Sequence, residues 1–469
     1  MGMTEATKKW IRGQARFNGI FDGKERGFGR KIPLSSVPVY DECREYIKEA
    51  LEAGLDGTQT QAFEDELAEY IGLKYAVAVS SGETALLLAL KLAAEKLYGS
   101  SSGIYTPSGA GRGGALLGKK VFCPDLMTAD MVNPIIFEGG EPIFIDSSDE
   151  GCGWSMSPEV LEMAFGKYPD VKIVVINHAY GFPGDILQVR KLCFAHDALL
   201  IECIGEGLGA EYRLPQDNAG QEVWSRAGVL GDYCVLNSGK ETLLQAAGGA
   251  VLTRGYYESE KARYWAGGAR AAVPWNQHEE LGLDCLMSDL DAAVLRGRLA
   301  HLGEIIEKKR HIYETYRKKL DGSLAYIIPA GEDTRPNYWM TAVTCESSLP
   351  FAETRNDRAY TYKDLHGTAA PMEIYDALQA FCADCRPVYK PMSMQPIYRN
   401  CEHFTLDGPW RMYEDFSTDE YSVRCDLART YYESGIVLPS DISMTEEEQD
   451  RIIDIVYACY DKPGMERGF

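Results

Sequence analysis

Apolar and polar positions near the start of the chain follow first a helical and then a strand-like period. Val39–Ala53 and Gln59–Ile71 carry charged residues on one face, which predicts two amphipathic helices. Ala76–Ser80 is a short β-prone run, and a strongly helical segment, Glu83–Leu97, follows the small residues of Ser81-Gly82. A strand, a turn of small residues and a long helix form the opening unit of a wound α/β domain.

Strand and helix patterns then alternate as far as residue 253. Continuous β-branched runs predict buried strands, and a cap residue before proline, as in Ser157-Pro158, predicts the start of a helix. The expected strands are Lys120–Cys123, Pro142–Ile145, Lys172–Ile176, Ala198–Glu202, Asp232–Leu236 and Ala250–Thr253, and the expected helices are Ala129–Phe137, Pro158–Tyr168 and Asp185–His196. This alternation predicts an α/β fold with a mostly parallel sheet covered on both faces.

A smaller α+β region is expected after the sheet. One long charged helix is predicted from Asp289 to about Leu320. It is followed by a predicted strand at Tyr338–Thr344 and by helices at Pro371–Ala383 and Thr445–Cys459, the last with Glu448 three residues after Thr445, as in a capping box. We therefore divide the chain into an N-terminal arm (1–38), a large domain (39–289) and a small C-terminal domain (290–469).

The charge balance excludes several classes of function. The 469 residues include 48 Lys and Arg against 70 Asp and Glu, a formal net charge of −22. Nucleic acid and anionic membranes require clustered cations, so neither partner is expected. The longest apolar runs are strand-sized, the first residues lack a signal-peptide pattern, and the 13 cysteines are dispersed. We expect a soluble cytoplasmic protein.

Three local motifs have a structural explanation beside a chemical one. The Gly-rich segment Gly99–Gly118 fits neither the P-loop nor the dinucleotide-binding template, because a strand follows where a helix should begin, so a surface loop is favoured. Cys382 and Cys385 form one CxxC without a second pair, so structural thiols are favoured and no metal site is expected. His278, beside two glutamates, fits a general base or a solvated polar turn.

A lysine between two predicted strands is more informative. Lys240 ends the loop Asn237-Ser238-Gly239-Lys240, and Gly248-Gly249 leads into the following strand. Lysine forms Schiff bases where a site lowers its pKa and orients it. An isolated lysine is otherwise a surface charge.

Seven segments, in order along the chain, resemble the DegT/DnrJ/StrS sugar aminotransferases. They are SSGETALLLALKLA (80–93), NPIIFEGGEPIFID (133–146), NHAYGFPGDI (177–186), LLIECIGEGLGAEY (199–212), GDYCVLNSGK (231–240), RPVYKPMSMQPIY (386–398) and LPSDISMTEEEQDRI (438–452). The resemblance implies a fold-type I enzyme that uses pyridoxal 5′-phosphate (PLP) to aminate keto-sugars on nucleotide carriers. It also implies a place in polysaccharide biosynthesis and an active site shared between two subunits.

At the positions that would contact PLP, the chain departs from the family pattern. The family's Ser-Gly-Thr turn, which binds the phosphate, is Ser81-Gly82-Glu83 here, and a carboxylate repels a phosphate dianion. Thr128 stands where an aromatic ring stacks on the pyridine. Cys203 replaces the aspartate that pairs with the ring nitrogen, and a thiol is a poor partner for a pyridinium.

Among the other site positions, some match the family pattern and some differ from it. Lys240 matches the Schiff-base lysine, although another gap placement would put Thr242 there. Glu206 matches a family position that takes Gln or Glu. The resemblance also implies cofactor contacts from His178, Asn237 and Ser238, with Tyr180 and Gly181 as further site-wall residues. Asp284 replaces an asparagine that reaches the neighbouring subunit's cofactor, and Ser393 replaces the histidine of the K-P-M-H segment.

These observations leave two functions of different class. The first is amino transfer through PLP on Lys240, from an amino acid such as glutamate to a keto-sugar nucleotide. The second is a PLP-free relative that acts as a binding or partner subunit of an active paralogue, because the substitutions gather at the cofactor positions while the scaffold segments stay recognisable. The oligomer would be a homodimer or a heterodimer with a paralogue.

Overall fold

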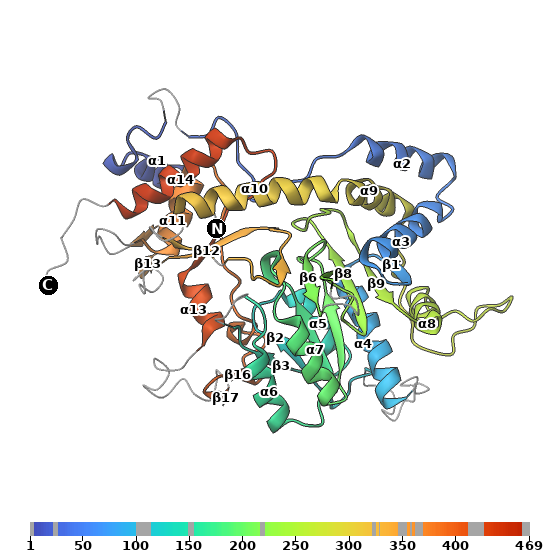
Figure 1. Ribbon diagram of the computed structural model, residues 1–469. Helices are drawn as coiled ribbons and strands as arrows, with labels where there is room; N and C mark the ends of the chain where they lie inside the picture. The colour runs from blue at the N-terminus through green and yellow to red at the C-terminus, as the bar shows by residue number, and fades with distance from the viewer. Residues whose placement is uncertain are drawn as a thin grey trace.

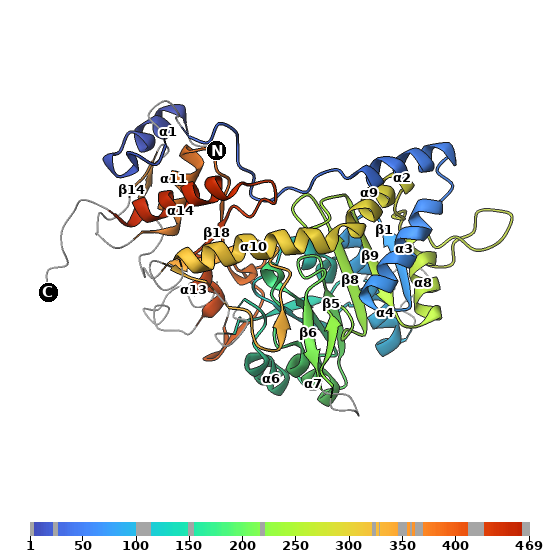
Figure 2. The same ribbon diagram turned by 45° about the horizontal axis from the view of Figure 1, so that its top comes forward.

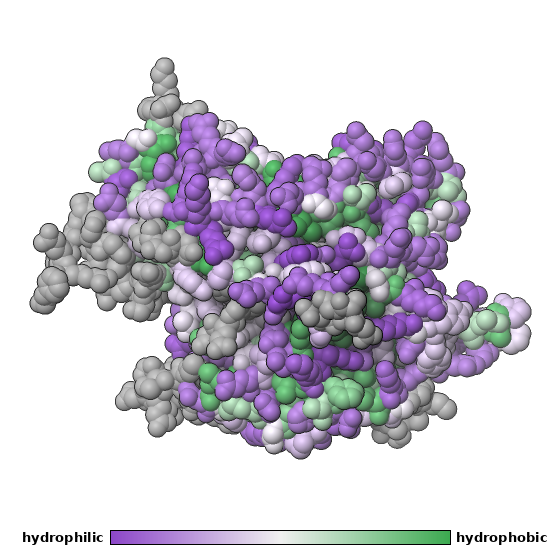
Figure 3. Space-filling model, in the orientation of Figure 1, coloured by the Kyte–Doolittle hydropathy of each residue, from purple (hydrophilic) through white to green (hydrophobic). Residues whose placement is uncertain are grey.

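The computed structural model describes most of the chain. The described residues are 4–21, 27–99, 114–148, 154–215, 221–320, 325–327, 329–345, 354–356, 359–361, 369–410 and 426–461. Most of the Gly-rich segment, residues 100–113, lies outside them. No helix among these residues is long and apolar enough to cross a membrane. On the face shown in Figure 3, hydrophilic side chains predominate, with apolar patches scattered between them.

A nine-stranded sheet forms the centre of the molecule (Figure 1), in the order β1-β9-β8-β5-β4-β2-β3-β16-β17. Neighbours from β8 to β16 run parallel, whereas β9 is antiparallel to β1 and β8, and β17 is antiparallel to β16. The strands are β1 (Tyr75–Val79), β2 (Lys120–Pro124), β3 (Glu141–Ile145), β4 (Ile173–Asn177), β5 (Leu199–Cys203), β8 (Tyr233–Ser238), β9 (Gly248–Thr253), β16 (His403–Thr405) and β17 (Gly408–Trp410). The predicted, mostly parallel sheet is confirmed.

Helices cover both faces of this sheet, because the strands are apolar on both sides. One buried cluster joins one strand face to α4 (Gly82–Tyr98), α5 (Asn133–Phe137) and α8 (Tyr256–Ala266). The other joins the opposite face to α3 (Thr58–Ile71), α6 (Pro158–Lys167) and α7 (Ile186–Ala195). The helix α2 (Asp41–Glu52) packs on α9 (Asp289–Ala300).

The helix α10 (Leu302–Leu320) runs from the part of the molecule that holds the large sheet to a smaller α+β region (Figures 1 and 2). Its four-stranded sheet has the order β10-β12-β18-β15. The strands are β10 (Ala325–Tyr326), β12 (Thr341–Cys345), β15 (Arg386–Pro387) and β18 (Gly435–Leu438), and the helices are α11 (Pro371–Ala380), α13 (Leu427–Ser434) and α14 (Glu446–Tyr460). The helix α1 (Glu5–Arg12) packs on α11, where Arg12 donates to the Ala380 carbonyl.

Small sheets and single turns complete the described structure. One sheet has the order β11-β6-β7, and another pairs β13 with β14. The remaining elements are β6 (Glu211–Leu214), β7 (Val223–Arg226), β11 (Thr334–Arg335), β13 (Thr354–Asn356) and β14 (Ala359–Thr361), with 3₁₀ turns η1 (Ala15–Phe17), η2 (Ala129–Met131), η3 (Ala179–Gly181) and η4 (Met392–Met394).

Two predicted helices are wrong in extent. The segment Ala129–Phe137 is not one helix, because η2 ends at Met131 and α5 begins at Asn133, with Pro134 in its first turn. The single helix predicted over Asp289–Leu320 is two helices that meet at His301. The boundary proposed at residue 289 remains a prediction. Strands β16 and β17, which come from beyond it, nevertheless extend the large sheet beside β3.

Candidate active site

The end of β5 directs two adjacent side chains to opposite faces of the sheet. Glu202 is fully buried, and its carboxylate accepts hydrogen bonds from the backbone N–H groups of Gly228 (2.7 Å) and Gly231 (2.8 Å) and lies 3.0 Å from His178 Nε2. Cys203 points the other way, into the cluster beneath α4. Because side chains alternate along a strand, Glu202 cannot reach the Cys203 face, as its register predicts. His178 contacts Glu202 and therefore lies on the Glu202 side of β5.

Burial and three carboxylates influence the Cys203 thiol. Burial raises the pKa of Cys203 above its ordinary value, and the charges of Glu202, Asp130 and Glu206 raise it further. Cys203 is therefore a neutral thiol at physiological pH. Burial also raises the pKa of Glu206 to about 7. Its two oxygens accept hydrogen bonds from the backbone N–H of Tyr180 (2.8 Å) and from the Tyr389 hydroxyl (3.1 Å).

The N-terminus of α4 is closed by its own side chains and by Asn237. Ser81 is the N-cap, and it forms a reciprocal capping box with Thr84. A Cβ on Gly82 would lie 2.3 Å from the Asn237 side chain, so only glycine fits this approach. Asn237 Nδ2 in turn donates to Asp130 Oδ2 at 2.9 Å. Glu83 follows in the first turn of α4, half-buried, and its carboxylate has no hydrogen bond or ion pair with any residue that the structure describes.

The structure places Lys240 apart from these contacts. Lys240 is exposed on the turn after β8, and its amine makes no hydrogen bond or ion pair within the described ranges. Ser238 is buried and donates to the Ala246 carbonyl at 2.9 Å. Thr242, the alternative position for the Schiff-base lysine, folds back onto the backbone of Gly239.

The remaining substituted positions are dispersed around the same edge. Thr128 is the half-buried N-cap residue of η2, two residues before Asp130. Asp284 is exposed in the segment that pairs with the end of β1, where Ser80 N–H donates to the Cys285 carbonyl. Ser393 is buried and donates to both oxygens of Asp125, through its N–H and its hydroxyl, at 2.7 Å each.

An aromatic wall holds a strained residue beside Glu206. Tyr180 has φ 58°, and its buried ring stacks on Tyr389 with centroids 4.9 Å apart. The Tyr180 hydroxyl accepts from the Tyr389 N–H at 2.8 Å. Gly181 has φ 86°, and a Cβ there would lie 1.8 Å from the Asn337 side chain. Tyr180 and Gly181 were expected in the site wall from the sequence.

Asp130 and Tyr389 were missed in the sequence. Asp130 lies in DLMTADMVNP, where the register to the family drew attention only to Thr128, and Tyr389 lies in the matching segment RPVYKP. No local signal marked Asp130, because it lies in the segment predicted as a helix and not at the end of a predicted strand. Their contacts to Asn237 and Glu206 follow only from the folded arrangement.

The CxxC pair and His278 lie on other parts of the molecule. Cys382 is exposed and Cys385 is buried, and both are free thiols. His278 lies on an exposed turn, with Nδ1 2.8 Å from the Gly268 carbonyl oxygen. Neither lies among the contacts around Cys203.

The chain was compared with protein families, curated relatives and solved structures. The family model described as "DegT/DnrJ/EryC1/StrS aminotransferase family" matches residues 39–457. The chain belongs to this family. Among its relatives, EpsN of Bacillus subtilis (strain 168) is 28% identical over 440 residues, which cover 91% of this chain and 95% of EpsN. GDP-perosamine synthase of Escherichia coli O157:H7 is 27% identical over 374 residues, which cover 78% of this chain and 88% of the synthase.

Solved structures of this aminotransferase family show the same fold. The DegT/DnrJ/EryC1/StrS aminotransferase from Brucella abortus superposes with a TM-score of 0.70 at 17% identity, covering 90% of this chain and 96% of that one. DesV from S. venezuelae, in complex with a ketimine intermediate, superposes with a TM-score of 0.69 at 21% identity and covers 92% and 99%. The chain therefore has the fold-type I architecture, with a mostly parallel large sheet and a smaller α+β part, and the family implies dependence on PLP.

The residues present do not fit PLP. A neutral, buried thiol at Cys203 cannot hold the ring nitrogen protonated, and Glu202 is bound on the opposite face of β5. Acids at Glu83 and Asp130 lie at the helix N-terminus where a phosphate would bind, and like charges repel there. Thr128 offers no ring for stacking.

Proposed function

We propose that this family member serves nucleotide-sugar metabolism as a binding or partner subunit and that it does not itself use PLP. The proposal rests on the two side chains at the end of β5, Glu202 and Cys203. There a buried thiol stands at the position of the ring-nitrogen acid. The acid that precedes it in the sequence, Glu202, already accepts two backbone hydrogen bonds and contacts His178. Turning Glu202 toward the pocket would leave those buried donors without an acceptor.

The ligand class follows from the family. Relatives named GDP-perosamine synthase and dTDP-3-amino-3,4,6-trideoxy-alpha-D-glucose transaminase match 78% and 72% of this chain. A keto-sugar nucleotide is therefore the small molecule we propose, with a paralogous aminotransferase or a second copy of this chain as the protein partner. A role in cell-surface polysaccharide synthesis is proposed on the same ground, since one relative is named spore coat polysaccharide biosynthesis protein SpsC.

A second candidate is amino transfer from an amino acid to the keto-sugar nucleotide. The retained Lys240, on the turn between β8 and β9, favours it. When bound, PLP would supply the electron sink that such a transfer requires. Lys240 would be the group that holds the cofactor and moves the proton, and Glu206, with a pKa raised to about 7, would be a neighbouring acid that titrates near neutral pH.

One experiment separates the two candidates. Purified full-length protein is mixed with PLP, and its visible spectrum is recorded before and after borohydride, with Lys240→Ala as the control. We expect the native protein to stay colourless and to bind PLP at least about 100-fold more weakly than a working family member, because one carboxylate about 4 Å from a phosphate charge costs on the order of 4 kcal/mol at an effective dielectric constant of about 20. A yellow native protein that bleaches with borohydride, and is colourless as Lys240→Ala, overturns the proposal in favour of amino transfer.

A restored variant makes a negative result informative. The variant combines Glu83→Thr, Thr128→Phe, Cys203→Asp and Asp284→Asn, which returns the family pattern at all four positions. We expect it to gain the PLP absorbance that native protein lacks if Lys240 is the Schiff-base position. Binding of nucleotide sugars is measured separately by calorimetry, with GDP-, UDP- and dTDP-linked sugars as the probes. No binding of any of them would overturn the ligand assignment.

A further inference from the structure

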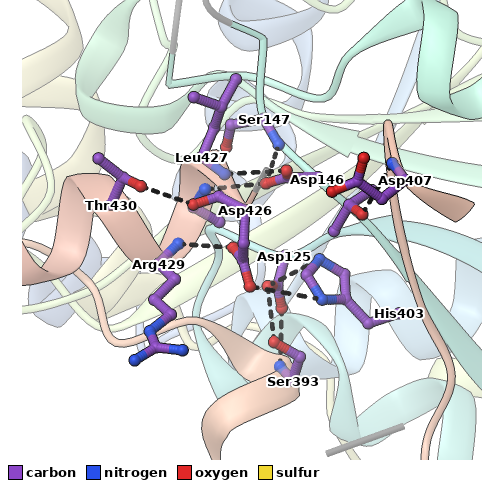
Figure 4. A network of polar contacts seen from close by, with 12 residues as sticks. Asp125, Asp146, Ser147, Ser393, His403, Asp407, Asp426, Leu427, Arg429 and Thr430 are labelled. Atoms are coloured by element: carbon purple, nitrogen blue, oxygen red, sulfur yellow. Dashed lines mark hydrogen bonds and ion pairs between the residues drawn. The ribbon is translucent and has the colours of Figure 1, made fainter. Parts of the chain in front are cut away.

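A second group of polar side chains, all buried, lies at the ends of β2 and β3. Asp125 follows β2, His403 begins β16, and Asp426 is the N-cap of α13. All three side chains are buried, and one donor atom from each lies within 4.8 Å of the others. Figure 4 shows the imidazole ring of His403 facing the two carboxylates. The three residues are too far apart in sequence for any spacing motif to reveal them.

The imidazole of His403 is fully buried and has no hydrogen bond with any residue that the structure describes. Nε2 lies 3.3 Å from Asp125 Oδ2, and Nδ1 lies 3.9 Å from Asp426 Oδ2. Both ring nitrogens lack a hydrogen-bond partner in the part of the chain that the structure describes. Buried polar groups are almost always satisfied, so two open nitrogens that face two carboxylates point to a missing group between them.

The other oxygens of the two aspartates are held by neutral donors. Asp125 Oδ1 accepts from the Ser393 N–H, and Asp426 Oδ1 accepts from the Arg429 N–H at 2.9 Å. The Arg429 guanidinium is turned away to Glu433. Asp125 Oδ2 also accepts from the Ser393 hydroxyl at 2.7 Å, and Oδ2 of each aspartate is the oxygen that faces His403.

The charges around His403 do not balance. Asp146, which follows β3, accepts from the N–H groups of Leu427 (2.9 Å) and Ala428 (2.8 Å) and adds a third buried carboxylate. Within the described ranges, His403 is the only ionisable base paired with Asp125 and Asp426, and the nearby Lys167 pairs with Glu402. A buried excess of negative charge is costly unless a cation compensates it.

We propose that Asp125, His403 and Asp426 bind one divalent transition-metal ion, with Zn²⁺ or Mn²⁺ as the chemical class. One imidazole nitrogen and one oxygen from each carboxylate form a set of one nitrogen and two oxygen donors, which suits these ions. Metal–ligand bonds of about 2.1 Å place tetrahedral ligands about 3.4 Å apart. One donor atom from each of the three residues lies within 4.8 Å of the others, so small side-chain shifts would close the set around an ion. The ion fastens the strand β16 and the start of α13 to the end of β2.

The first test is metal content and stability of tag-free, full-length protein. Bound metal is removed with EDTA, and the protein is dialysed against Zn²⁺, Mn²⁺ or Mg²⁺ in turn. The metal content is then measured by elemental mass spectrometry, and the melting temperature is measured by thermal unfolding. We expect one equivalent of Zn²⁺ or Mn²⁺ per chain and a melting temperature higher by about 4 °C or more at saturation, because a ligand that binds only the folded state stabilises it. Less than about a tenth of an equivalent of every ion, with an unchanged melting temperature in folded protein, overturns the proposal.

Two variants and a matched control locate the ion. We expect His403→Gln and Asp426→Asn each to lower the bound metal at least about tenfold. The control His311→Gln changes an exposed histidine that also faces a carboxylate, Glu446 at 3.6 Å, and should keep the full equivalent. Where a variant does not fold, the visible absorption of Co²⁺ bound to native protein reports the tetrahedral donor set directly. Metal retained by both folded variants, or Co²⁺ protein without that absorption, places the ion elsewhere and overturns the assignment.

Discussion

Two groups of acidic side chains occupy the same edge of the large sheet, and they meet the cost of their charge in different ways. The pocket group, Asp130 and Glu206, is half-buried, and its oxygens accept from Asn237, Tyr180 and Tyr389. The deep group, Asp125, Asp146 and Asp426, is buried beside His403. Partial exposure lets the pocket group rely on hydrogen bonds and a retained proton. In the fully buried group, the proposed metal ion meets that cost.

The difference bears on how the two sites can change in evolution. Exchanging a partly exposed acid changes local electrostatics at little cost to folding, so a pocket of this kind can lose its cofactor contacts while the scaffold persists. A deep group joined to three distant parts of the chain has no such freedom. Substitutions in each group test this difference.

The largest expected effect comes from Asp125→Ala. Removing this carboxylate leaves the buried N–H and hydroxyl of Ser393 without an acceptor, and we expect the free energy of unfolding to fall by about 3–5 kcal/mol. Glu206→Ala in the pocket group should cost only about 1 kcal/mol. Urea unfolding of both variants measures the difference, and equal losses would remove the distinction between the groups.

Cys203→Asp places a third acid beside Asp130 and Glu206. A buried carboxylate next to two others is expected to lower the free energy of unfolding by about 2–3 kcal/mol at pH 8 and by less at pH 5, where it takes up a proton. Cys203→Ser is the control of similar size without charge. Stability of Cys203→Asp that does not depend on pH would show that the pocket is more open to water than its burial indicates.

Ser393→Ala and Ser238→Ala form a matched pair within the two groups. Each removes one buried hydroxyl, but Ser393 donates to a carboxylate and Ser238 donates to a backbone carbonyl. Hydrogen bonds to charged groups are stronger, so we expect a loss of about 2 kcal/mol for Ser393→Ala against about 1 kcal/mol for Ser238→Ala. Thermal or urea unfolding ranks the two, and a reversed order would contradict the assignment of charge to Asp125.

The smallest effect concerns the pH dependence of the pocket group. The folded-state pKa of Glu206 is raised to about 7 from an ordinary value of 4.5, so the folded protein keeps a proton that the unfolded chain loses between these values. Its contribution to stability is complete below about pH 4.5 and is lost as the pH rises toward 7. Glu206→Gln should therefore stabilise the protein at pH 8 by about 1 kcal/mol, a figure reduced for partial exposure. Urea unfolding from pH 5 to 8 measures this, with the exposed Glu69→Gln expected to show no such trend.

Much of the fold was predictable because its signals are local. Ser157 caps α6 as expected, and the capping box predicted from Thr445 and Glu448 is present in both directions. The alternation that separates Glu202 from Cys203 follows from β5 being a strand. The break at Val132, before Pro134 in α5, was missed because short helical turns on either side of it have the same apolar spacing as one helix.

The sites were less predictable because their parts are distant in sequence. The family pattern indicated Lys240, Cys203 and Thr128, but it gave no indication that Asp130 would hold Asn237 against α4. His403 carried no signal at all. Its neighbours in sequence do not include its carboxylate partners, and only the pairing of β16 with β3 brings it to Asp125.

The pairing of β16 with β3 also has a consequence for how the chain reaches its folded state. Until His403–Thr405 has been synthesised, β3 is an open edge with unpaired N–H and C=O groups, and such an edge invites pairing with another chain. Because β16 and β17 come from residues 403–410, the large sheet cannot be completed until most of the polypeptide has been synthesised. Fragments that end before residue 403 are expected to aggregate, and the nascent protein depends on protection of β3 through most of its translation.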